Sequence, residues 1–190
     1  MSELKLNKIT KKDLKQIFIQ NVLGLQLGWN YEKMQGLGYA YSVMPALKRL
    51  YKDDPKKMKQ ALNMEMGFFN TTPQMAHLIV GADVALQDQL GMNDENEKAI
   101  TGLKTGLMGP FAGVGDTIFV AIYNAIIYSI TAYLALSNQP IGLLIPVIGC
   151  LSFYGFAGNC SKLACHKGPG WQQPLRIAWR LSRKVLLSLG

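Results

Sequence analysis

Residues 102–136 read GLKTGLMGPFAGVGDTIFVAIYNAIIYSITAYLAL, and this stretch decides how the chain folds. The ten residues from Gly106 to Gly115 hold four glycines and a proline, so we expect that they cannot form a regular helix throughout. The residues that follow, 117–136, are uncharged and mostly apolar. At about 1.5 Å per helical residue they are long enough to cross a bilayer. The stretch therefore predicts an irregular segment followed by a membrane helix.

A second apolar segment, residues 141–157, follows a polar turn and contains Pro146 and several glycines. It is near the lower length limit for a full span, which predicts a short, kinked or re-entrant membrane segment. Non-helical backbone at membrane depth is tolerated only where protein or a water-filled cavity satisfies its polar groups. Transporters build substrate sites from such broken segments.

Signals for helices fill the residues before Gly102. Apolar residues recur at spacings of three and four, and Pro45 is expected to kink the helix that contains it. Gly91 is expected to close a helix over residues 74–90. Cap signals mark three helix starts, at Thr10 to Asp13, at Asp54 before Pro55, and at Thr72 before Pro73. The predicted fold class is all-α, an integral membrane protein with amphipathic and broken or re-entrant helices.

The charge of the 190-residue chain is unevenly placed. All twelve acids lie at or before Asp116, where the chain has a net charge of +2, while residues 117–190 carry +6 and no acid. Between Asp116 and Lys162 lie 45 uncharged residues. A nucleic-acid-binding protein would instead spread bases along one face with aromatics between them. We therefore expect no nucleic-acid partner.

The last residues form a basic tail, 158–190. Its Arg and Lys residues alternate with apolar residues between Leu175 and Lys184, which predicts a basic amphipathic helix at a membrane surface. The positive-inside rule places such a helix on the cytoplasmic side. An alternative function is therefore a membrane-surface interaction protein whose tail binds anionic lipid.

Two groups of polar residues are candidates for a site. Asp116 precedes the apolar span, where an acid is costly unless it is paired or hydrated, so it is functional, a helix cap, or both. Asn70 and Thr71 follow two phenylalanines, and amides and hydroxyls beside aromatics suit sugar binding. The more common explanation of Asn70 and Thr71 is a helix-to-helix connection that uses them as caps.

Other sites are not indicated. The glycine-rich segment lacks the lysine of a phosphate-binding loop, and no set of residues forms a catalytic constellation. Cys160, Cys165 and His166 offer three ligands where a closed zinc site needs four. His77 is expected to be structural. We expect no metal, no cofactor and no catalytic residue.

Three blocks of sequence resemble the IID membrane subunit of mannose-type phosphotransferase systems. Together they cover about residues 10 to 136, and the third is long and highly specific. The blocks are Gly28-Trp29-Asn30-Tyr31-Glu32-Lys33-Met34-Gln35, Phe68-Phe69-Asn70-Thr71 with Pro73, and Gly102 to Asp116 with Lys104, Gly106, Gly109, Pro110, Gly113 and Gly115.

The resemblance implies a function in sugar uptake. Members pair with a IIC membrane subunit to form a permease for a hexose or amino sugar. Cytoplasmic IIA and IIB proteins relay phosphate from phosphoenolpyruvate and phosphorylate the sugar on entry. The phosphorylated histidines belong to those partners, so the chain is expected to be a non-catalytic transport subunit. The implied location is the bacterial inner membrane, as a multi-pass protein in a hetero-oligomer.

The resemblance also implies site residues. The motif positions carried over as lining the sugar path are Asn70, Thr71, Gly113 and Asp116. IIC is expected to hold most of the direct sugar contacts. Further motif residues are Trp29, Asn30, Phe69, Pro73, Gly109, Pro110 and Gly115.

Two features depart from the family pattern. Thr117 stands where members often have Pro or Ser, and members continue with further membrane segments where this chain has its atypical tail. We therefore expect an incomplete IID-type permease domain over residues 1–157. We expect the tail to come from a frameshifted or truncated reading frame. Reading the DNA past codon 157 in the other two frames tests this expectation.

Overall fold

A computed structural model describes residues 6–137, 139–152 and 155. Within these residues the chain is all-α, and its only bridges are two isolated ones. The elements are α1 (Lys11–Gly24), α2 (Gly36–Leu50), α3 (Pro55–Glu65), α4 (Pro73–Leu90), α5 (Asp94–Gly115), the π-helix η1 (Asp116–Tyr123), α6 (Asn124–Leu136) and the 3-10 helix η2 (Pro140–Leu143).

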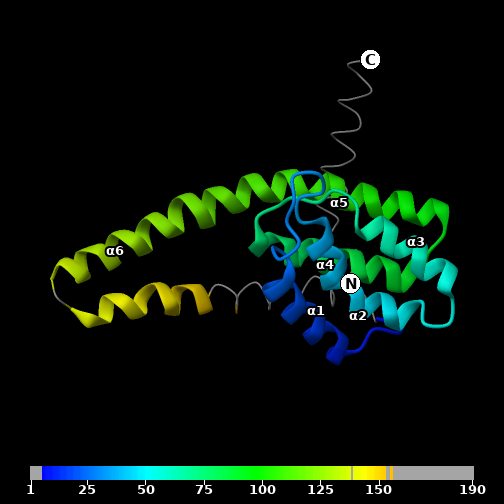
Figure 1. The fold of residues 1–190 in the computed structure, drawn as a ribbon, viewed down its shortest axis with the longest axis horizontal. Helices are drawn as coiled ribbons and strands as arrows, with labels where there is room; N and C mark the ends of the chain where they lie inside the picture. Colours follow the sequence, from blue (N-terminus) through cyan, green and yellow to red (C-terminus); the bar gives the residue numbers. More distant parts are fainter. Residues whose placement is uncertain (1–5, 138, 153–154, 156–190) are drawn as a thin grey trace, which may run out of the picture.

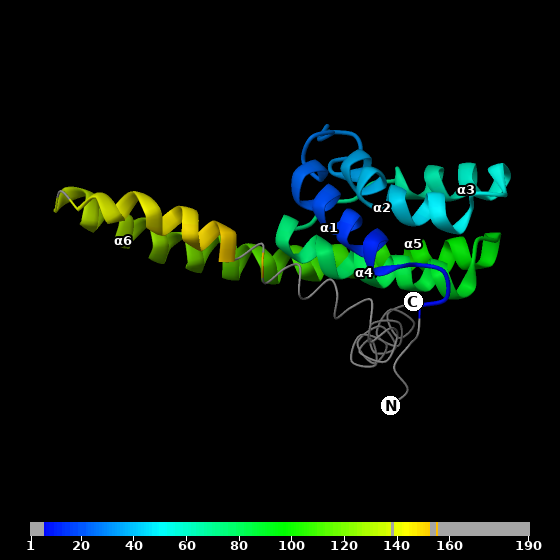
Figure 2. The same cartoon turned by 90° about the horizontal axis from the view of Figure 1, so that it is seen from below.

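Two parts are visible in Figure 1, which we call the body and the arm. The body is α1 to α4 packed against α5, and the arm is α6 with the residues that follow it. Helices α5, η1 and α6 form one continuous helix of 43 residues, Asp94–Leu136. After η2 the chain is helical again over residues 144–152 and returns beside α6, as Figures 1 and 2 both show.

The arm is a tightly packed helical hairpin. An added Cβ on Gly142 would lie 3.0 Å from the Cβ of Leu134. One on Gly149 would lie 2.5 Å from the Tyr123 hydroxyl. Glycine at these two positions therefore lets the returning segment approach α6. The outer apolar side chains are exposed, including Tyr133 at 71% and Leu136 at 87%. By length and composition, the continuous helix is able to cross a membrane.

The glycine-rich segment is helical, so the expected break between Gly106 and Gly115 is wrong. Helix α5 runs through Pro110 to Gly115, and the departure from α geometry comes directly afterwards, in η1. Glycine and proline lower helix propensity, but tertiary contacts routinely override it. Here the Thr71 hydroxyl, just before α4, donates to the carbonyl of Met108 in α5, and the Thr72 hydroxyl lies 3.1 Å from the carbonyl oxygen of Ala112. Short π-helical turns occur frequently at functional sites.

The expected helix starts are confirmed in the body. Thr10 and Asp13 form the capping box of α1, and the Asp54 side chain accepts from the backbone N–H of Lys57 at the start of α3. Helix α4 begins at Pro73 and ends before Gly91, which has a φ of 69°. Thr72 occupies the cap position of α4, but its side chain caps nothing there.

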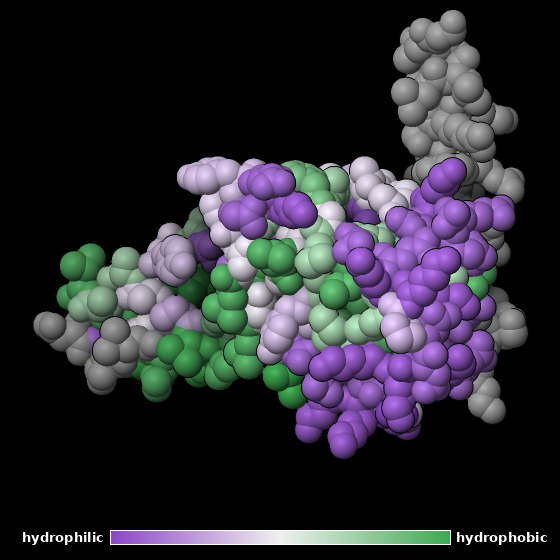
Figure 3. All heavy atoms as spheres, turned by 45° about the vertical axis from the view of Figure 1, so that its right-hand side comes forward, coloured by the Kyte–Doolittle hydropathy of each residue, from purple (hydrophilic) through white to green (hydrophobic). Residues whose placement is uncertain are grey.

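The body has an apolar core and a hydrophilic end. The largest fully buried side chains include Tyr39, Phe69 and Ile79 from three different segments. Arg49 forms an ion pair with Asp13, so the end of α2 lies beside the start of α1. After α2 the chain turns into α3. The lysines of this end are exposed, and Figure 3 shows hydrophilic side chains gathered over one side of the body. These lysines are Lys11, Lys12, Lys15, Lys48, Lys52, Lys56, Lys57 and Lys59.

Candidate functional site

The first motif block folds into a turn organised by Asn30. Its Oδ1 accepts from the backbone N–H groups of Glu32 (3.1 Å) and Lys33 (2.9 Å), and its Nδ2 donates to the carbonyl of Gly28 (3.1 Å). Asparagine suits such a turn because its short amide mimics a backbone group. The turn places Met34 in the left-handed region, with a φ of 52°.

This turn holds the second motif block by its backbone. The N–H of Gln35 donates to the carbonyl of Phe69 (2.8 Å), and the N–H of Phe69 donates to the carbonyl of Lys33 (3.3 Å). The buried ring of Phe69 packs on Tyr39, with 4.3 Å between ring centroids. Phe69 is thus a core anchor for the loop rather than an exposed sugar-stacking ring.

The side chain of Gln35 fixes Thr71. Its Nε2 donates to the Thr71 carbonyl (2.8 Å), and its Oε1 accepts from the Thr71 N–H (3.1 Å). Gln35 is buried, so both bonds are shielded from water. These two hydrogen bonds fix the backbone of Thr71 and thereby orient the hydroxyl groups of Thr71 and Thr72.

Both hydroxyl groups contact the long helix. Thr71 Oγ1 donates to the carbonyl of Met108 (3.0 Å). Thr72 Oγ1 lies 2.7 Å from Oδ1 of Asp116 and 3.1 Å from the carbonyl oxygen of Ala112. The Thr72 hydroxyl therefore connects the start of α4 to the first residue of η1. A hydrogen bond to a charged carboxylate is stronger than one between neutral groups.

Gly115 makes this contact sterically possible. An added Cβ would lie 2.4 Å from Thr72 Oγ1 and 2.9 Å from the Cγ of Met75. The other glycines of the third block differ, since a Cβ on Gly102, Gly106, Gly109 or Gly113 would meet nothing within 4 Å. These four residues lie on one exposed face of α5, at spacings of four, three and four.

The structure brings together only part of the predicted sugar path. Thr71 is buried and close to the Thr72–Asp116 pair, while Asp116 itself is exposed. Asn70 is exposed, and its side chain bonds none of the described residues. Gly113 is exposed one helical turn before Thr117, whose hydroxyl donates to its carbonyl (2.9 Å). It remains a prediction that Asn70, Thr71, Gly113 and Asp116 line the sugar path.

The remaining motif residues serve mainly to shape the chain. Trp29 is exposed and meets the ring of Tyr31 edge to face, with 4.9 Å between ring centroids. Pro73 begins α4. Gly109 and Pro110 are exposed on α5.

A buried polar network, which the sequence did not indicate, lies beneath this loop. Lys104 Nζ is 2.6 Å from Glu65 Oε2 and 4.2 Å from the centre of the Tyr39 ring. Gln87 Nε2 donates to Glu65 Oε1 (2.6 Å) and to Asp83 Oδ1 (2.8 Å), while Tyr39 donates to Asp83 Oδ2 (2.6 Å). The network therefore joins α2, α3, α4 and α5 by hydrogen bonds.

The network contains two carboxyl groups and one ammonium group. Burial, together with the nearby Asp83 carboxylate, raises the pKa of Glu65 to about 8, although Lys104 acts in the opposite direction. Burial and the carboxylates also raise the pKa of Tyr39 well above its usual value. The buried Glu65 carboxyl group therefore keeps its proton to a higher pH than an exposed glutamate does.

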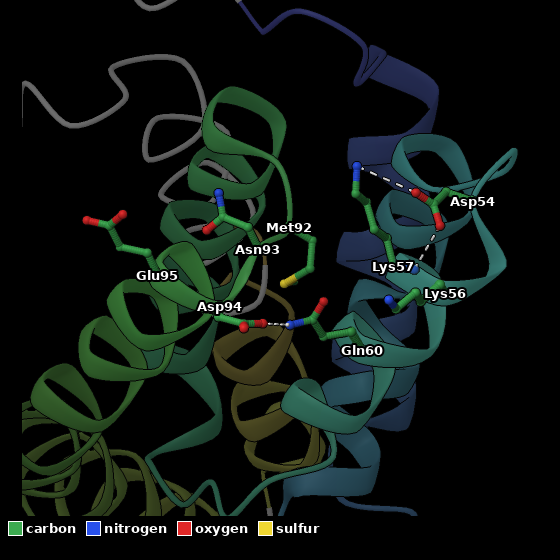
Figure 4. Close-up of a pocket in the computed structure, with 8 residues that line it drawn as sticks. All are labelled: Asp54, Lys56, Lys57, Gln60, Met92, Asn93, Asp94 and Glu95. Atoms are coloured by element: carbon green, nitrogen blue, oxygen red, sulfur yellow. Dashed lines mark hydrogen bonds and ion pairs between the residues drawn. The ribbon is translucent and has the colours of Figure 1, made fainter.

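The two main pockets contain no site of obvious chemistry. The larger, about 510 Å³, lies between the starts of α3 and α5. Figure 4 shows Gln60 pointing to Asp94 and Lys57 to Asp54, while Glu95 points away. Of its charged groups, Lys57 and Asp54 form an ion pair, and Asp94 accepts a hydrogen bond from Gln60. The smaller, about 240 Å³, adjoins the loop and is lined by Met64, Gly67, Phe68, Thr101, Lys104, Thr105 and Met108.

Two further sequence predictions have separate outcomes. Cys160, Cys165 and His166 lie outside the described residues. Among the described residues, no group of three or more His, Cys, Asp or Glu side chains is placed to hold a metal ion. His77 is buried in α4 against Phe18, with 5.1 Å between ring centroids.

The geometry of the three motif blocks agrees with a family match. The sequence pattern of the PTS system mannose/fructose/sorbose family IID component matches residues 8–168. The chain belongs to this IID family. Its members are membrane subunits of sugar phosphotransferase transport, which confirms the resemblance drawn from the sequence. The match extends past residue 157, where the atypical tail was expected to begin.

Known IID proteins support the assignment. The mannose-specific EIID component of Escherichia coli K12 is 40% identical over 162 residues, which cover 82% of this chain and 57% of that protein. The fructose permease IID component of Bacillus subtilis 168 is 37% identical, over 73% and 50% of the two chains. The sorbose-specific EIID component of Klebsiella pneumoniae is 37% identical, over 83% and 54%. This IID chain thus spans just over half the length of these curated relatives.

Solved structures agree with the IID fold. A chain of the mannose transporter ManYZ, in complex with microcin E492, superposes with a TM-score of 0.78 at 35% identity, covering 84% of this chain and 59% of that one. A second structure, described as a membrane protein, gives a TM-score of 0.76 at 32% identity, covering 97% and 70%. The all-α membrane fold is therefore confirmed.

Proposed function

We propose that this chain forms, with a IIC subunit, the path by which a hexose or amino sugar crosses the bacterial inner membrane. IIA and IIB proteins phosphorylate the sugar on entry, and this chain contributes no catalytic residue. The observation that carries the proposal is the Thr72–Asp116 hydrogen bond of 2.7 Å. The Thr72 hydroxyl and the Asp116 carboxylate lie together where the body meets the apolar arm.

The chemistry of this junction suits a sugar. A carboxylate accepts hydrogen bonds from sugar hydroxyls, and Asp116 stays exposed although Thr72 holds one of its oxygens. Asn70, also exposed, offers both a donor and an acceptor. Sites of this type in transporters occur where helices depart from regular geometry, as η1 does from Asp116 onward.

A multi-pass topology is part of the proposal, and the arm and the charges support it. Residues 117–136 and 141–157 are proposed to enter the membrane as a hairpin. The lysine-rich end of the body faces the cytoplasm, as the positive-inside rule favours. The same rule places the basic tail, 158–190, on the cytoplasmic side. The family match supports a transport subunit over a surface protein held by its tail.

The exposed glycine face of α5 is the proposed contact for IIC. Gly102, Gly106, Gly109 and Gly113 leave open space above the helix backbone. Because glycine has no side chain beyond Cα, these positions let the backbone of a partner helix approach α5 closely. The chain is therefore proposed to work as a hetero-oligomer.

Sugar uptake by cells that carry the chain with its IIC, IIA and IIB partners tests the proposal. Thr72→Val and Asp116→Asn should each lower uptake about tenfold or more, the effect of losing a hydrogen bond to a charged group. Thr105→Val is the matched control, because that exposed hydroxyl bonds only a carbonyl of its own helix. Unchanged uptake by Asn70→Ala and Asp116→Ala would remove the site assignment.

A further inference from the structure

Unpaired polar groups gather where α1 meets α4. Asn21 is 2% exposed and His77 is 1% exposed, so both are almost completely shielded from solvent. Neither side chain forms a hydrogen bond with any described residue. The unpaired buried atoms of this contact are Gln20 Oε1, Asn21 Nδ2 and Oδ1, Gln74 Oε1, and His77 Nδ1 and Nε2.

Two contacts fix how α1 lies along α4. The backbone N–H groups of Asn7 and Lys8, just before α1, donate to the carboxylate of Asp88 near the end of α4. Further along α1, the ring of Phe18 lies against His77. The two helices are therefore antiparallel, and continuing their register by one turn brings Asn21 opposite Gln74.

So many unpaired groups at one contact need an explanation. Buried polar groups in native proteins are almost always hydrogen-bonded, to protein or to ordered water. Buried water typically makes about three hydrogen bonds to such groups. The cluster therefore offers hydrogen-bond donors and acceptors from both helices, as a binding site for a small polar molecule would.

The groups carry no net charge. Burial lowers the pKa of His77 to about 4, so the imidazole is neutral at physiological pH and offers one donor and one acceptor. The amides of Asn21 and Gln74 are neutral as well, and Phe18 adds an aromatic wall. Neutral donors and acceptors beside an aromatic ring suit hydroxyl groups and offer no charge for an ion.

We propose that Asn21, Gln74 and His77 form an internal binding site for neutral hydroxyl groups. Water and the transported sugar both supply such groups. The sugar as a source rests on the proposed function, because Gln74 lies only two residues after Thr72, which holds Asp116. Water as a source does not depend on it.

The first experiment measures the thermal unfolding of the chain in complex with its IIC subunit. Asn21→Leu and His77→Phe should each lower the Tm, by about 2–4 °C, because a bridged polar group is lost. His77→Gln, which keeps a donor and an acceptor, should recover part of the loss. Asn63→Leu on the exposed side of α3 is the control. A higher Tm for the apolar variants would overturn the proposal, since removing truly unpaired groups stabilises a fold.

The second experiment does not depend on variants that fold. A high-resolution density map of the wild-type complex, without sugar and with saturating mannose, should show a bridging density between Asn21 and His77. Density that is the same in both maps identifies water, and density that changes shape with mannose identifies sugar. A direct Asn21–Gln74 amide pair with no bridging density overturns the site. Wild-type uptake, measured separately, tells this failure from a failure of the proposed function.

Discussion

The ammonium group of Lys104 lies 2.6 Å from a carboxylate oxygen of Glu65, and both side chains are buried. This pair ties α3 to α5 directly below the loop that bears Thr71. Because Gln87 and Asp83 join the same network from α4, the pair holds three helices in one arrangement. The loop that bears the sugar-path candidates is therefore next to a buried network of charged and polar side chains.

Removing the cation should destabilise the body strongly. Above pH 8, where Glu65 is ionised, Lys104→Met leaves its carboxylate without a positive partner, and an uncompensated buried charge costs about 3–5 kcal/mol. The free energy of unfolding of the purified complex, measured by denaturant titration, checks this. Lys98→Met, on the exposed face of α5, should change it by less than about 0.5 kcal/mol. Equal effects of the two variants would contradict the role given to Lys104.

The stability should fall as the pH rises toward 8. The raised pKa of Glu65, about 8 against an ordinary 4.5, means that the folded chain keeps a proton that the unfolded chain has lost. This stabilisation is complete below pH 4.5 and is lost as the pH rises to about 8, with a slope of up to about 1.4 kcal/mol per unit. His77, whose pKa burial lowers to about 4, acts oppositely below its ordinary 6.5.

The window from pH 6.5 to 8 therefore isolates Glu65 from His77. Unfolding of the wild-type complex should become easier across this window, while Glu65→Gln should remove most of the slope. A wild-type slope that survives in Glu65→Gln would assign the proton to another group.

Two glycines of α5 should respond oppositely to alanine. Gly115→Ala places a Cβ against Thr72 and Met75, so we expect a loss of about 1–3 kcal/mol in stability and a matching loss of uptake. Gly102→Ala meets nothing and should stabilise the helix by up to about 1 kcal/mol. Thermal unfolding and uptake of both variants check the pair. A harmless Gly115→Ala would show that the close contact is not required.

Larger residues on the glycine face should block assembly and leave the chain folded. Gly106→Leu and Gly113→Leu fill the open space proposed for a IIC helix. Co-purification with tagged IIC should fall, with the helical circular-dichroism signal of the chain unchanged. Leu136→Ala at the tip of the arm serves as a control for exposed apolar surface. Full co-purification of both glycine variants would place the IIC contact elsewhere.

The helix starts and the family were readable from sequence because they depend on local chemistry. Asp54 before Pro55 and Thr72 before Pro73 favour helix starts through short-range sterics and capping. The path of the glycine-rich segment was not readable, because propensity disfavours the helix there and contacts from residues about forty positions away stabilise it.

The candidate site was predicted only in part for the same reason. Thr72 looked like a cap, and nothing in its neighbours shows that its hydroxyl reaches Asp116 instead. Gln35 and the Lys104–Glu65 pair act on residues far away in the chain. A lysine inside the glycine-rich block, and a glutamate within an apolar stretch, were the available signals for a buried ion pair.

The helix from Asp94 to Leu136 is about 65 Å long at 1.5 Å per residue, twice the hydrocarbon thickness of a bilayer. Asp116, which is hydrogen-bonded to Thr72, lies close to the midpoint of this helix. The contact with Thr72 therefore holds this helix near its middle, at the proposed sugar path. Two halves of similar length therefore extend from this contact, one along the body and one along the arm.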